Sequence, residues 1–177
     1  MATLRFYLQQ TDHQLFHRIQ QHRGWLSRYS RVISSTADGY WYVAFTLLYY
    51  LYGQIANDGQ LPSFVLLICT CFLIERPVYY LLKNTCRRQR PPQAIPGFES
   101  QITASDKFSF PSGHTSAAFM FSMCCLLSFG FIALPLLAWA TYVALSRIYL
   151  GVHFPADVIV GALLGVSIAW QLNNIFF

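Results

Sequence analysis

The sequence predicts an all-α membrane protein, a bundle of about five transmembrane helices preceded by an amphipathic helix at the membrane surface. Hydrophobic residues make up 55% of its 177 residues and charged residues only 11%, against about 25% charged residues in an average soluble protein. The mean hydropathy of +0.39 points the same way. Several segments approach the roughly 20 apolar residues that a transmembrane helix needs. The length fits one membrane-embedded domain that covers residues 1–177.

Residues 1–36 are polar and predict an amphipathic segment. Apolar side chains recur at helical spacing between glutamine, histidine and arginine, as in one helix or in two helices divided near Gly24. The apolar positions are Leu8, Leu15, Ile19, Leu26, Tyr29 and Ile33. Because the polar face is rich in arginine, we expect the segment to lie in the headgroup plane, although a helix packed on the protein's own surface fits the pattern equally well. The segment lacks the apolar core of a secretory signal.

Five apolar segments follow and predict the transmembrane helices. They cover residues 39–56, 61–83, 112–129, 131–150 and 155–177. An Asn-Asp-Gly turn at 57–59 joins the first two. The second contains Glu75 and Arg76, which we expect to face the bundle interior because charges at membrane depth are costly. Residues 84–110 form a long polar connection of the kind that usually has a function.

Alternating helix directions bring the polar stretches to one face of the membrane. The second predicted helix ends at Lys83 and the fourth ends near Arg147, whereas the third begins at Ser112 and the fifth begins near His153. All four positions therefore fall on the same side. An odd number of spans places the N-terminal segment on that side as well. We expect these stretches to converge in one pocket.

The net charge of +5 does not indicate nucleic acid as a partner. The positive charge is divided between the N-terminal segment and the connection after Lys83, and a basic rim on a membrane protein is typical of contact with anionic lipid headgroups. The five cysteines contain no CxxC pair. The sequence therefore predicts no metal site, cofactor or disulfide framework.

Three polar stretches, residues 83–91, 111–114 and 146–157, contain residues of the kinds that bind phosphate. Lys83, Arg90 and Arg147 would neutralise phosphate oxygens, and arginine forks suit two-point phosphate contacts. Ser112 and Gly113 predict the start of a helix, whose free N–H groups bind phosphate readily. The adjoining His114 would reach the same site. Each feature on its own has a simpler explanation as an interfacial cation or a capping turn, and Arg87 and Arg88 are left as interfacial cations.

The third stretch predicts a nucleophile. A helix that begins at Pro155 puts His153 and Asp157 on one face and within contact. A carboxylate held against one ring nitrogen raises the basicity of the other, so His153 would attack phosphorus to form a phosphohistidine. His114 would protonate the leaving oxygen as a general acid. A structural His–Asp pair explains this motif alone, but not two histidines, a carboxylate and three cations on one face.

These three stretches resemble the signature motifs of the type 2 phosphatidic acid phosphatase superfamily, which groups membrane lipid phosphatases with the vanadium haloperoxidases. The matching patterns are Lys83-x6-Arg90-Pro91, Pro111-Ser112-Gly113-His114 and Ser146-Arg147-x5-His153-x3-Asp157. The resemblance implies a metal-independent phosphatase without a cofactor. By that match, Lys83, Arg90, Ser112, Gly113 and Arg147 hold the phosphate, His153 is the nucleophile oriented by Asp157, and His114 is the acid.

The resemblance implies a lipid phosphate as substrate, such as phosphatidylglycerophosphate, phosphatidate or undecaprenyl pyrophosphate. A phosphotransferase on the same scaffold has the same motifs, and a transporter or channel lined by Glu75, Arg76 and the histidines is an alternative of a different class. A bacterial inner membrane is the expected location. The positive-inside rule favours a cytoplasmic active site. Five N-terminal arginines lie on the catalytic side, whereas the loops on the opposite side have no cation and Asp58 as their charged residue. These arginines are Arg5, Arg18, Arg23, Arg28 and Arg31.

Overall fold

The computed structural model describes residues 2–21, 25–56, 61–104 and 106–176. Its elements in chain order are α1 (Ala2–Gln21), α2 (Trp25–Ser35), α3 (Gly39–Ala56), α4 (Leu61–Cys86), α5 (Pro91–Ala94), α6 (Gly113–Phe129), the 3₁₀ turn η1 (Gly130–Ala133), α7 (Leu134–Tyr149) and α8 (Pro155–Phe176). These described residues form helices and connections without a strand. The predicted all-α fold class is therefore confirmed.

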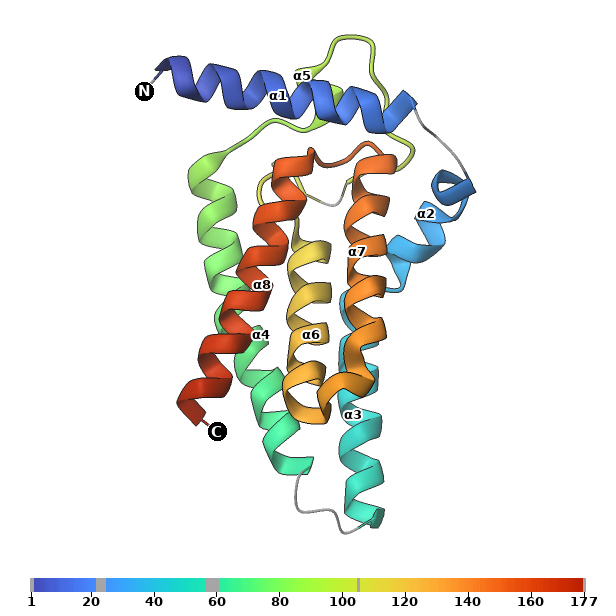
Figure 1. Ribbon diagram of the computed structural model, residues 1–177, viewed down its shortest axis with the longest axis vertical. Coiled ribbons are helices and arrows are strands. Elements are labelled where there is room, and N and C mark those ends of the chain that lie inside the picture. Colours follow the sequence, from blue (N-terminus) through green and yellow to red (C-terminus); the bar gives the residue numbers. More distant parts are fainter. Residues whose placement is uncertain (1, 22–24, 57–60, 105, 177) are drawn as a thin grey trace.

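The five long helices that follow α2 run side by side as an upright bundle (Figure 1). The central helix is α6, which packs most extensively against α8 and also contacts α7 and α4, while α3 lies against α4. Ala118, Cys124 and Cys125 of α6 are each at most 1% exposed. A helix that is apolar around its whole circumference is typical of such a central position.

Two glycines of α8 let it lie directly against the first turns of α6. A Cβ atom at Gly161 would stand 2.6 Å from the carbonyl oxygen of Ser112, and one at Gly165 would stand 2.2 Å from that of Ser116. Real Cβ atoms do not approach oxygen so closely, so both positions require glycine. Small residues four apart permit such backbone contact between membrane helices. The start of α6 and the first half of α8 are therefore held together.

Three stretches of the described chain are long and apolar enough to cross a membrane: Ser63–Ala94, Gly113–Tyr149 and Pro155–Ile175. The second is 37 residues long and includes both α6 and α7, because η1 joins them without a break in helical structure. The tyrosine-rich α3 is outside this set. These three stretches cover four of the five predicted spans, and the chain is an integral membrane protein.

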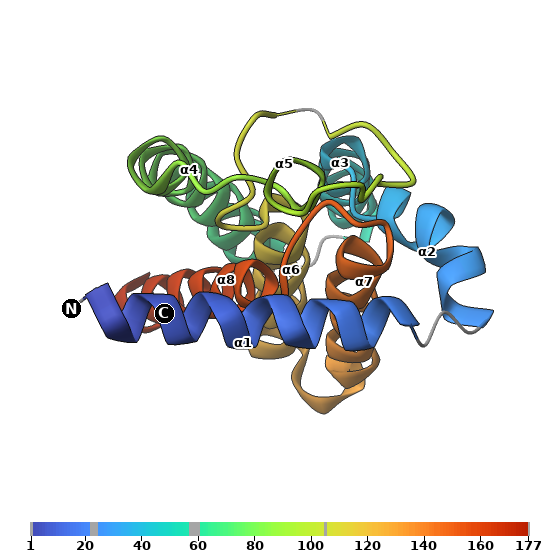
Figure 2. The same cartoon turned by 90° about the horizontal axis from the view of Figure 1, so that it is seen from above.

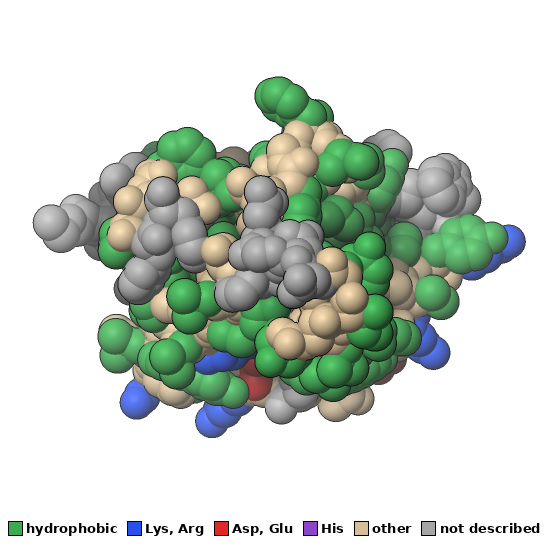
Figure 3. Space-filling view, turned by 90° about the horizontal axis from the view of Figure 1, so that it is seen from below, with side chains coloured by type: hydrophobic (Ala, Val, Ile, Leu, Met, Phe, Trp, Pro, Cys, Tyr) green, Lys and Arg blue, Asp and Glu red, His purple; other side chains and the backbone are tan. Residues whose placement is uncertain are grey.

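The predicted bounds of the spans agree closely with the helices. The expected 39–56 equals α3, while α4 continues past Lys83 to Cys86. The third helix begins at Gly113, with Ser112 as its N-cap residue. The predicted turn at 57–59 lies outside the described residues, as does Gly24. Figure 3 shows the end of the bundle away from α1, where hydrophobic and uncharged side chains predominate and Lys and Arg lie toward the margins.

The N-terminal segment forms two helices, one of the two arrangements that its pattern allows. Figures 1 and 2 show α1 lying across one end of the bundle, while α2 packs beside α7. Phe16, which is not among the expected apolar positions, is fully buried, whereas Leu15 is 43% exposed. Phe16 packs edge-to-face on Phe98 and Phe154. This helix is therefore seated on the protein's own surface, at the end where the polar stretches meet.

Candidate active site

The polar ends of four helices lie together, as the alternation of spans predicts. The C-terminal ends of α4 and α7 and the N-terminal ends of α6 and α8 meet at the end of the bundle that α1 crosses (Figure 1). The connection that contains α5 covers the same end (Figure 2). The predicted site residues therefore come from distant parts of the chain and share one region.

Asp106 joins two of the predicted phosphate-binding cations. Lys83 Nζ donates to Asp106 Oδ2 over 2.6 Å, and Tyr79 Oη donates to the same oxygen over 2.9 Å. Arg90 donates from Nη2 to Asp106 Oδ1 and from Nε to the Asp106 carbonyl oxygen. The side chains of Lys83 and Arg90 are 5% and 7% exposed, against 36% for Asp106. One accessible carboxylate thus bridges two buried cations.

The two cations keep Asp106 ionised. Partial burial on its own would raise the pKa of Asp106, but the hydrogen bonds and charges of Lys83 and Arg90 outweigh burial and lower the pKa to about 2. A phosphate also presents negative oxygens, and a lysine and an arginine that donate to them are what it needs from its site. The pocket therefore binds an anion, which in this structure is the protein's own carboxylate.

His153 is buried between this anion pocket and Asp157. Its Nε2 lies 3.5 Å from Arg90 Nη1, and its Nδ1 lies 3.6 Å from Asp157 Oδ2. The second distance is that of an electrostatic contact and exceeds a hydrogen bond. Burial lowers the pKa of His153 to about 4, and the charge of Arg147 adds to this against the opposing effect of Asp157. The imidazole is therefore neutral at pH 7, with Nε2 facing the cations.

Arg88 is not the interfacial cation that the sequence predicts. Its Nη1 donates to Asp157 Oδ1 over 2.7 Å, its Nη2 donates to Asp12 of α1, and its side chain is 18% exposed. The guanidinium also lies over the Phe154 ring, 4.4 Å from the centroid. Asp12 in turn accepts a hydrogen bond from the backbone N–H of Ala156. The prediction was wrong because both carboxylate partners are about 70 residues away along the chain.

The start of α6 is fixed by backbone contacts. Ser112 N–H donates to the Asp157 carbonyl oxygen over 3.0 Å, and the Ser112 hydroxyl pairs with Thr115 Oγ1 at 2.9 Å. A Cβ atom at Gly113 would stand 3.0 Å from the Tyr79 ring, tighter than most real contacts. The short side chains of this motif thus let α6 begin directly beside the Tyr79–Lys83 part of α4, where its free N–H groups are close to the cations.

Arg147 and His114 have partners from the N-terminal third of the chain. Arg147 Nη1 donates to Ser34 Oγ over 2.5 Å, and its buried Nε has no hydrogen-bond partner. His114 Nε2 lies 2.9 Å from Asp38 Oδ1, and the His114 side chain is 29% exposed. His114 thus lies on the more open side of the site, hydrogen-bonded to a carboxylate that the sequence analysis did not single out.

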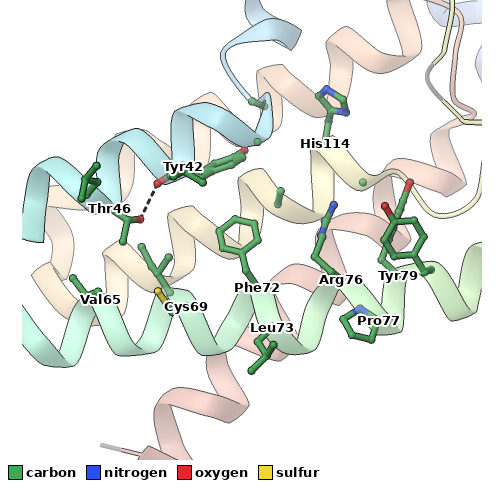
Figure 4. A pocket seen from close by; sticks show the side chains of 18 of the residues that line it. Tyr42, Thr46, Val65, Cys69, Phe72, Leu73, Arg76, Pro77, Tyr79 and His114 are labelled. Carbon is green, nitrogen blue, oxygen red and sulfur yellow. Dashed lines mark hydrogen bonds between the residues drawn. The ribbon is translucent and has the colours of Figure 1, made fainter.

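A lateral groove leads from His114 along α3 and α4. Its volume is about 1140 Å³, and Figure 4 shows His114, Arg76 and Tyr79 near one end and Thr46, Val65 and Cys69 near the other. Figures 1 and 2 show α4 diverging from α3 toward the active-site end. The lining side chains are mostly apolar or aromatic, including Tyr42, Val43, Leu47, Tyr50, Ile68, Phe72 and Leu73. The groove can therefore hold a hydrocarbon chain whose polar end is in the site.

The structure brings Lys83, Arg90, His153 and Asp157 into one connected cluster, with His114 and Arg147 at its edge. Sequence reasoning missed Asp12, Asp38, Asp106 and the pairing of Arg88. The composition could have indicated these carboxylates. The chain has only seven acidic residues against twelve Lys and Arg, so each carboxylate was a candidate partner for a buried lysine or arginine. The described residues contain no group of three His, Cys, Asp or Glu that could hold a metal ion.

A model of the PAP2 superfamily matches residues 64–177. A decaprenylphosphoryl-5-phosphoribose phosphatase of Mycobacterium tuberculosis is 34% identical over 106 residues, 58% of this chain and 55% of that protein. A phosphatidylglycerophosphatase B of Haemophilus influenzae is 34% identical over 83 residues, 40% of this chain and 32% of that protein. The chain thus spans about half the length, or less, of these curated relatives.

Two solved structures have the same fold. The crystal structure of Aquifex aeolicus LpxE superposes with a TM-score of 0.75 at 26% identity and covers 91% of this chain and 93% of that one. A transmembrane PAP2 type phosphatidylglycerolphosphate phosphatase from Bacillus subtilis superposes with a TM-score of 0.76 at 21% identity, covering 96% of this chain and 86% of the other. The match includes nearly the whole described bundle.

Proposed function

The chain belongs to the PAP2 superfamily, and we propose that it is an integral-membrane lipid phosphatase that acts through a phosphohistidine on His153. Its homologues are membrane lipid phosphatases. In this proposal residues 1–177 form one membrane-embedded phosphatase domain, with residues 1–36 as its surface segment and residues 84–110 as its active-site loop.

One observation carries the proposal: an anion already lies between Lys83 and Arg90, next to the ring nitrogen of a neutral histidine. Asp106 supplies this anion, and His153 Nε2 is 3.5 Å from Arg90. A phosphate that replaced the Asp106 carboxylate would keep both cationic contacts. Its phosphorus would then face a nitrogen with a free electron pair, which is the geometry of nucleophilic attack.

The first step transfers the phosphoryl group to the enzyme. His153 Nε2 attacks phosphorus, a P–N bond forms and the P–O bond to the lipid breaks. His114 gives its proton to the leaving oxygen. Asp157 orients the imidazole and stabilises the positive charge that develops on it. Lys83, Arg90, Arg147 and the N–H groups that begin with Ser112 and Gly113 stabilise the charge on the equatorial oxygens.

The second step releases phosphate. A water molecule attacks the phosphorus of the phosphohistidine while His114 takes one of its protons. The P–N bond breaks, inorganic phosphate leaves, and His153 and His114 return to their starting protonation states. The positive charges that this chemistry needs come from lysine and arginine, so we expect activity in the presence of EDTA.

The groove along α3 and α4 supports a lipid as substrate. It opens between transmembrane helices and reaches the site at His114, so a hydrocarbon chain would enter it from the bilayer. The substrate would be a lipid phosphomonoester or pyrophosphate, of the phosphatidylglycerophosphate, phosphatidate or undecaprenyl pyrophosphate type. The location of the site at one end of the bundle argues against a transporter, whose sites usually lie near the midplane.

We place the enzyme in a bacterial inner membrane with its active site toward the cytoplasm. The N-terminal helices lie at the catalytic end (Figure 1), and the side chains of Arg18, Arg28 and Arg31 are exposed there. Such cations favour the cytoplasmic side. Cysteine-accessibility labelling tests this orientation: labelling of both Arg18→Cys and Gln101→Cys from outside the cell would overturn it.

A phosphotransferase is the second candidate, because the phosphohistidine could react with a lipid hydroxyl in place of water. The exposed side of the pocket at Asp106 leaves room for either acceptor. A phosphorylated acceptor that accumulates at the expense of inorganic phosphate would identify the transferase.

The proposal is tested by phosphate release from detergent-purified protein in EDTA, with His153→Ala as the control. The substrate panel is phosphatidylglycerophosphate, phosphatidate, undecaprenyl pyrophosphate and lipid A. We expect release by the wild type and a loss of about 10³-fold or more in the variant, as for other enzyme nucleophiles. Equal release by both proteins would refute the role of His153, and no release by the wild type would refute the hydrolase.

A further inference from the structure

Arg76 is a charged groove residue for which the proposed mechanism has no role. It lies next to Glu75 in α4, and Glu75 is fully buried. The Glu75 carboxylate accepts hydrogen bonds from Ser116 Oγ over 2.6 Å and from Arg76 Nε. These two contacts account for the burial of the Glu75 charge. They use only one of the three nitrogens of the guanidinium.

Arg76 lines the groove, where its Nη1 is accessible, while its Nη2 is enclosed by protein. Among the described residues Nη2 is buried without a hydrogen-bond partner, and Nε to Glu75 is the hydrogen bond that the structure gives this side chain. The side chain is 38% exposed, and its guanidinium lies over the Tyr79 ring, 4.9 Å from the centroid. Figure 4 shows it pointing from α4 toward the side of His114. The accessible Nη1 has no hydrogen-bond acceptor within the described protein, so a ligand in the groove can supply one.

The position of Arg76 along α4 indicates which part of a bound lipid would accept its hydrogen bond. Arg76, Tyr79 and Lys83 follow one another at helical spacing on one face of α4, and seven residues correspond to about 10 Å along the axis. Lys83 binds at the anion pocket, whereas Arg76 lies farther along the groove on the side of the hydrocarbon lining. A group held by Arg76 would therefore lie between the phosphate to be removed and the lipid tails.

We propose that Arg76 binds a second phosphate of the substrate, the phosphodiester that joins a phosphorylated headgroup to the hydrocarbon part. A guanidinium with an accessible Nη1 suits a phosphate oxygen, and contact with an anion would give Nη1 the acceptor that the protein does not supply. The separation from Lys83 suits two phosphates joined through a short polyol or a sugar. This inference rests on the proposed phosphatase function and adds a preference for lipids that have both phosphates.

The test compares phosphatidylglycerophosphate with phosphatidate, which share acyl chains and a terminal phosphate but differ in the inner phosphodiester. We expect the wild type to have the higher kcat/KM for phosphatidylglycerophosphate. In the double variant Glu75→Gln/Arg76→Gln no unpaired charge remains buried, and we expect its kcat/KM for phosphatidylglycerophosphate to fall about tenfold or more, as for loss of a charged hydrogen bond. The value for phosphatidate should fall far less, and Arg76→Lys should retain part of the preference.

Arg87→Gln is the matched control, because it removes an exposed cation of the same segment that does not line the groove. Its substrate ratio should equal that of the wild type. An equal loss for both lipids in the double variant, or an unchanged ratio, would overturn the role of Arg76 while leaving the phosphatase intact. Failure of the wild type to release phosphate from either lipid would instead refute the proposed function.

Discussion

The two sides of the site differ in how completely they are enclosed. On the side of α1 and α8, Asp157 and His153 are at most 2% exposed, and Asp12 is 9% exposed. On the side of α3 and α4, the side chains of Asp106 and Arg76 are 36% and 38% exposed. Every carboxylate oxygen of the enclosed side has a partner within the protein, whereas the open side contains a displaceable carboxylate and a guanidinium that is paired only through its Nε.

This difference separates two requirements of the proposed chemistry. A nucleophile has to be held in one orientation before the substrate arrives, and buried hydrogen-bonded charges provide that. A headgroup has to enter and leave, which needs groups that can exchange their partners. Substitutions on the enclosed side should therefore reduce the rate of the chemical step, and those on the open side should change affinity and substrate choice.

Arg88→Gln should lower the rate for every substrate, with an effect as large as that of either substitution considered after it. It leaves Asp12 and Asp157 without their shared cation, so the imidazole of His153 loses a well-oriented partner. We expect kcat to fall by roughly 10²-fold, within the range seen when a partner that orients a catalytic group is lost, with little change in KM. Steady-state kinetics in detergent measures both parameters.

Arg87→Gln serves as the control for Arg88, since it removes the neighbouring cation and should leave kcat intact. Arg88→Lys should recover part of the loss because it restores one positive charge. A rise in KM without a fall in kcat would contradict the assignment of Arg88 to the enclosed side.

His114 lies on the boundary between the two sides. The loss of rate in His114→Ala should depend on the leaving group. A general acid contributes about 10²–10⁴-fold when the leaving oxygen needs a proton. We expect a loss of about 10²-fold with a lipid alkoxide and a much smaller loss with p-nitrophenyl phosphate, whose leaving group needs no proton. Parallel assays of the two substrates measure this contrast, and equal losses would show that His114 is not the acid.

Asp106→Asn should have the smallest effect and the opposite sign. The neutral amide competes less well than the carboxylate for Lys83 and Arg90, so inorganic phosphate should bind more tightly, by up to about fivefold for a partly exposed ion pair. Competitive inhibition by inorganic phosphate measures this affinity. Weaker inhibition in the variant would mean that Asp106 helps to bind phosphate and does not compete with it.

Most of the architecture follows from local patterns in the sequence. Apolar runs and the turns between them predicted the helices, and counting the spans predicted which ends meet. The bridge from Asp12 through Arg88 to Asp157 was not predictable in this way, because its members are 76 and 69 residues apart. The same holds for Asp106 and Asp38, whose partners are set by the packing of distant helices. Local periodicity also failed at Phe16, where neighbouring apolar residues left the buried face ambiguous.

The close contact of α8 with α6 lets the substrate range change without a change in the geometry of the reacting groups. Gly161 and Gly165 bring backbone against backbone beside Ser112, and Ser112 is hydrogen-bonded to the backbone of Asp157. The spacing between the Ser112 turn and His153, the proposed nucleophile, is therefore independent of most side chains. Headgroup and tail preferences can change through α3, α4 and the connection before α6, while the reacting atoms keep their separation.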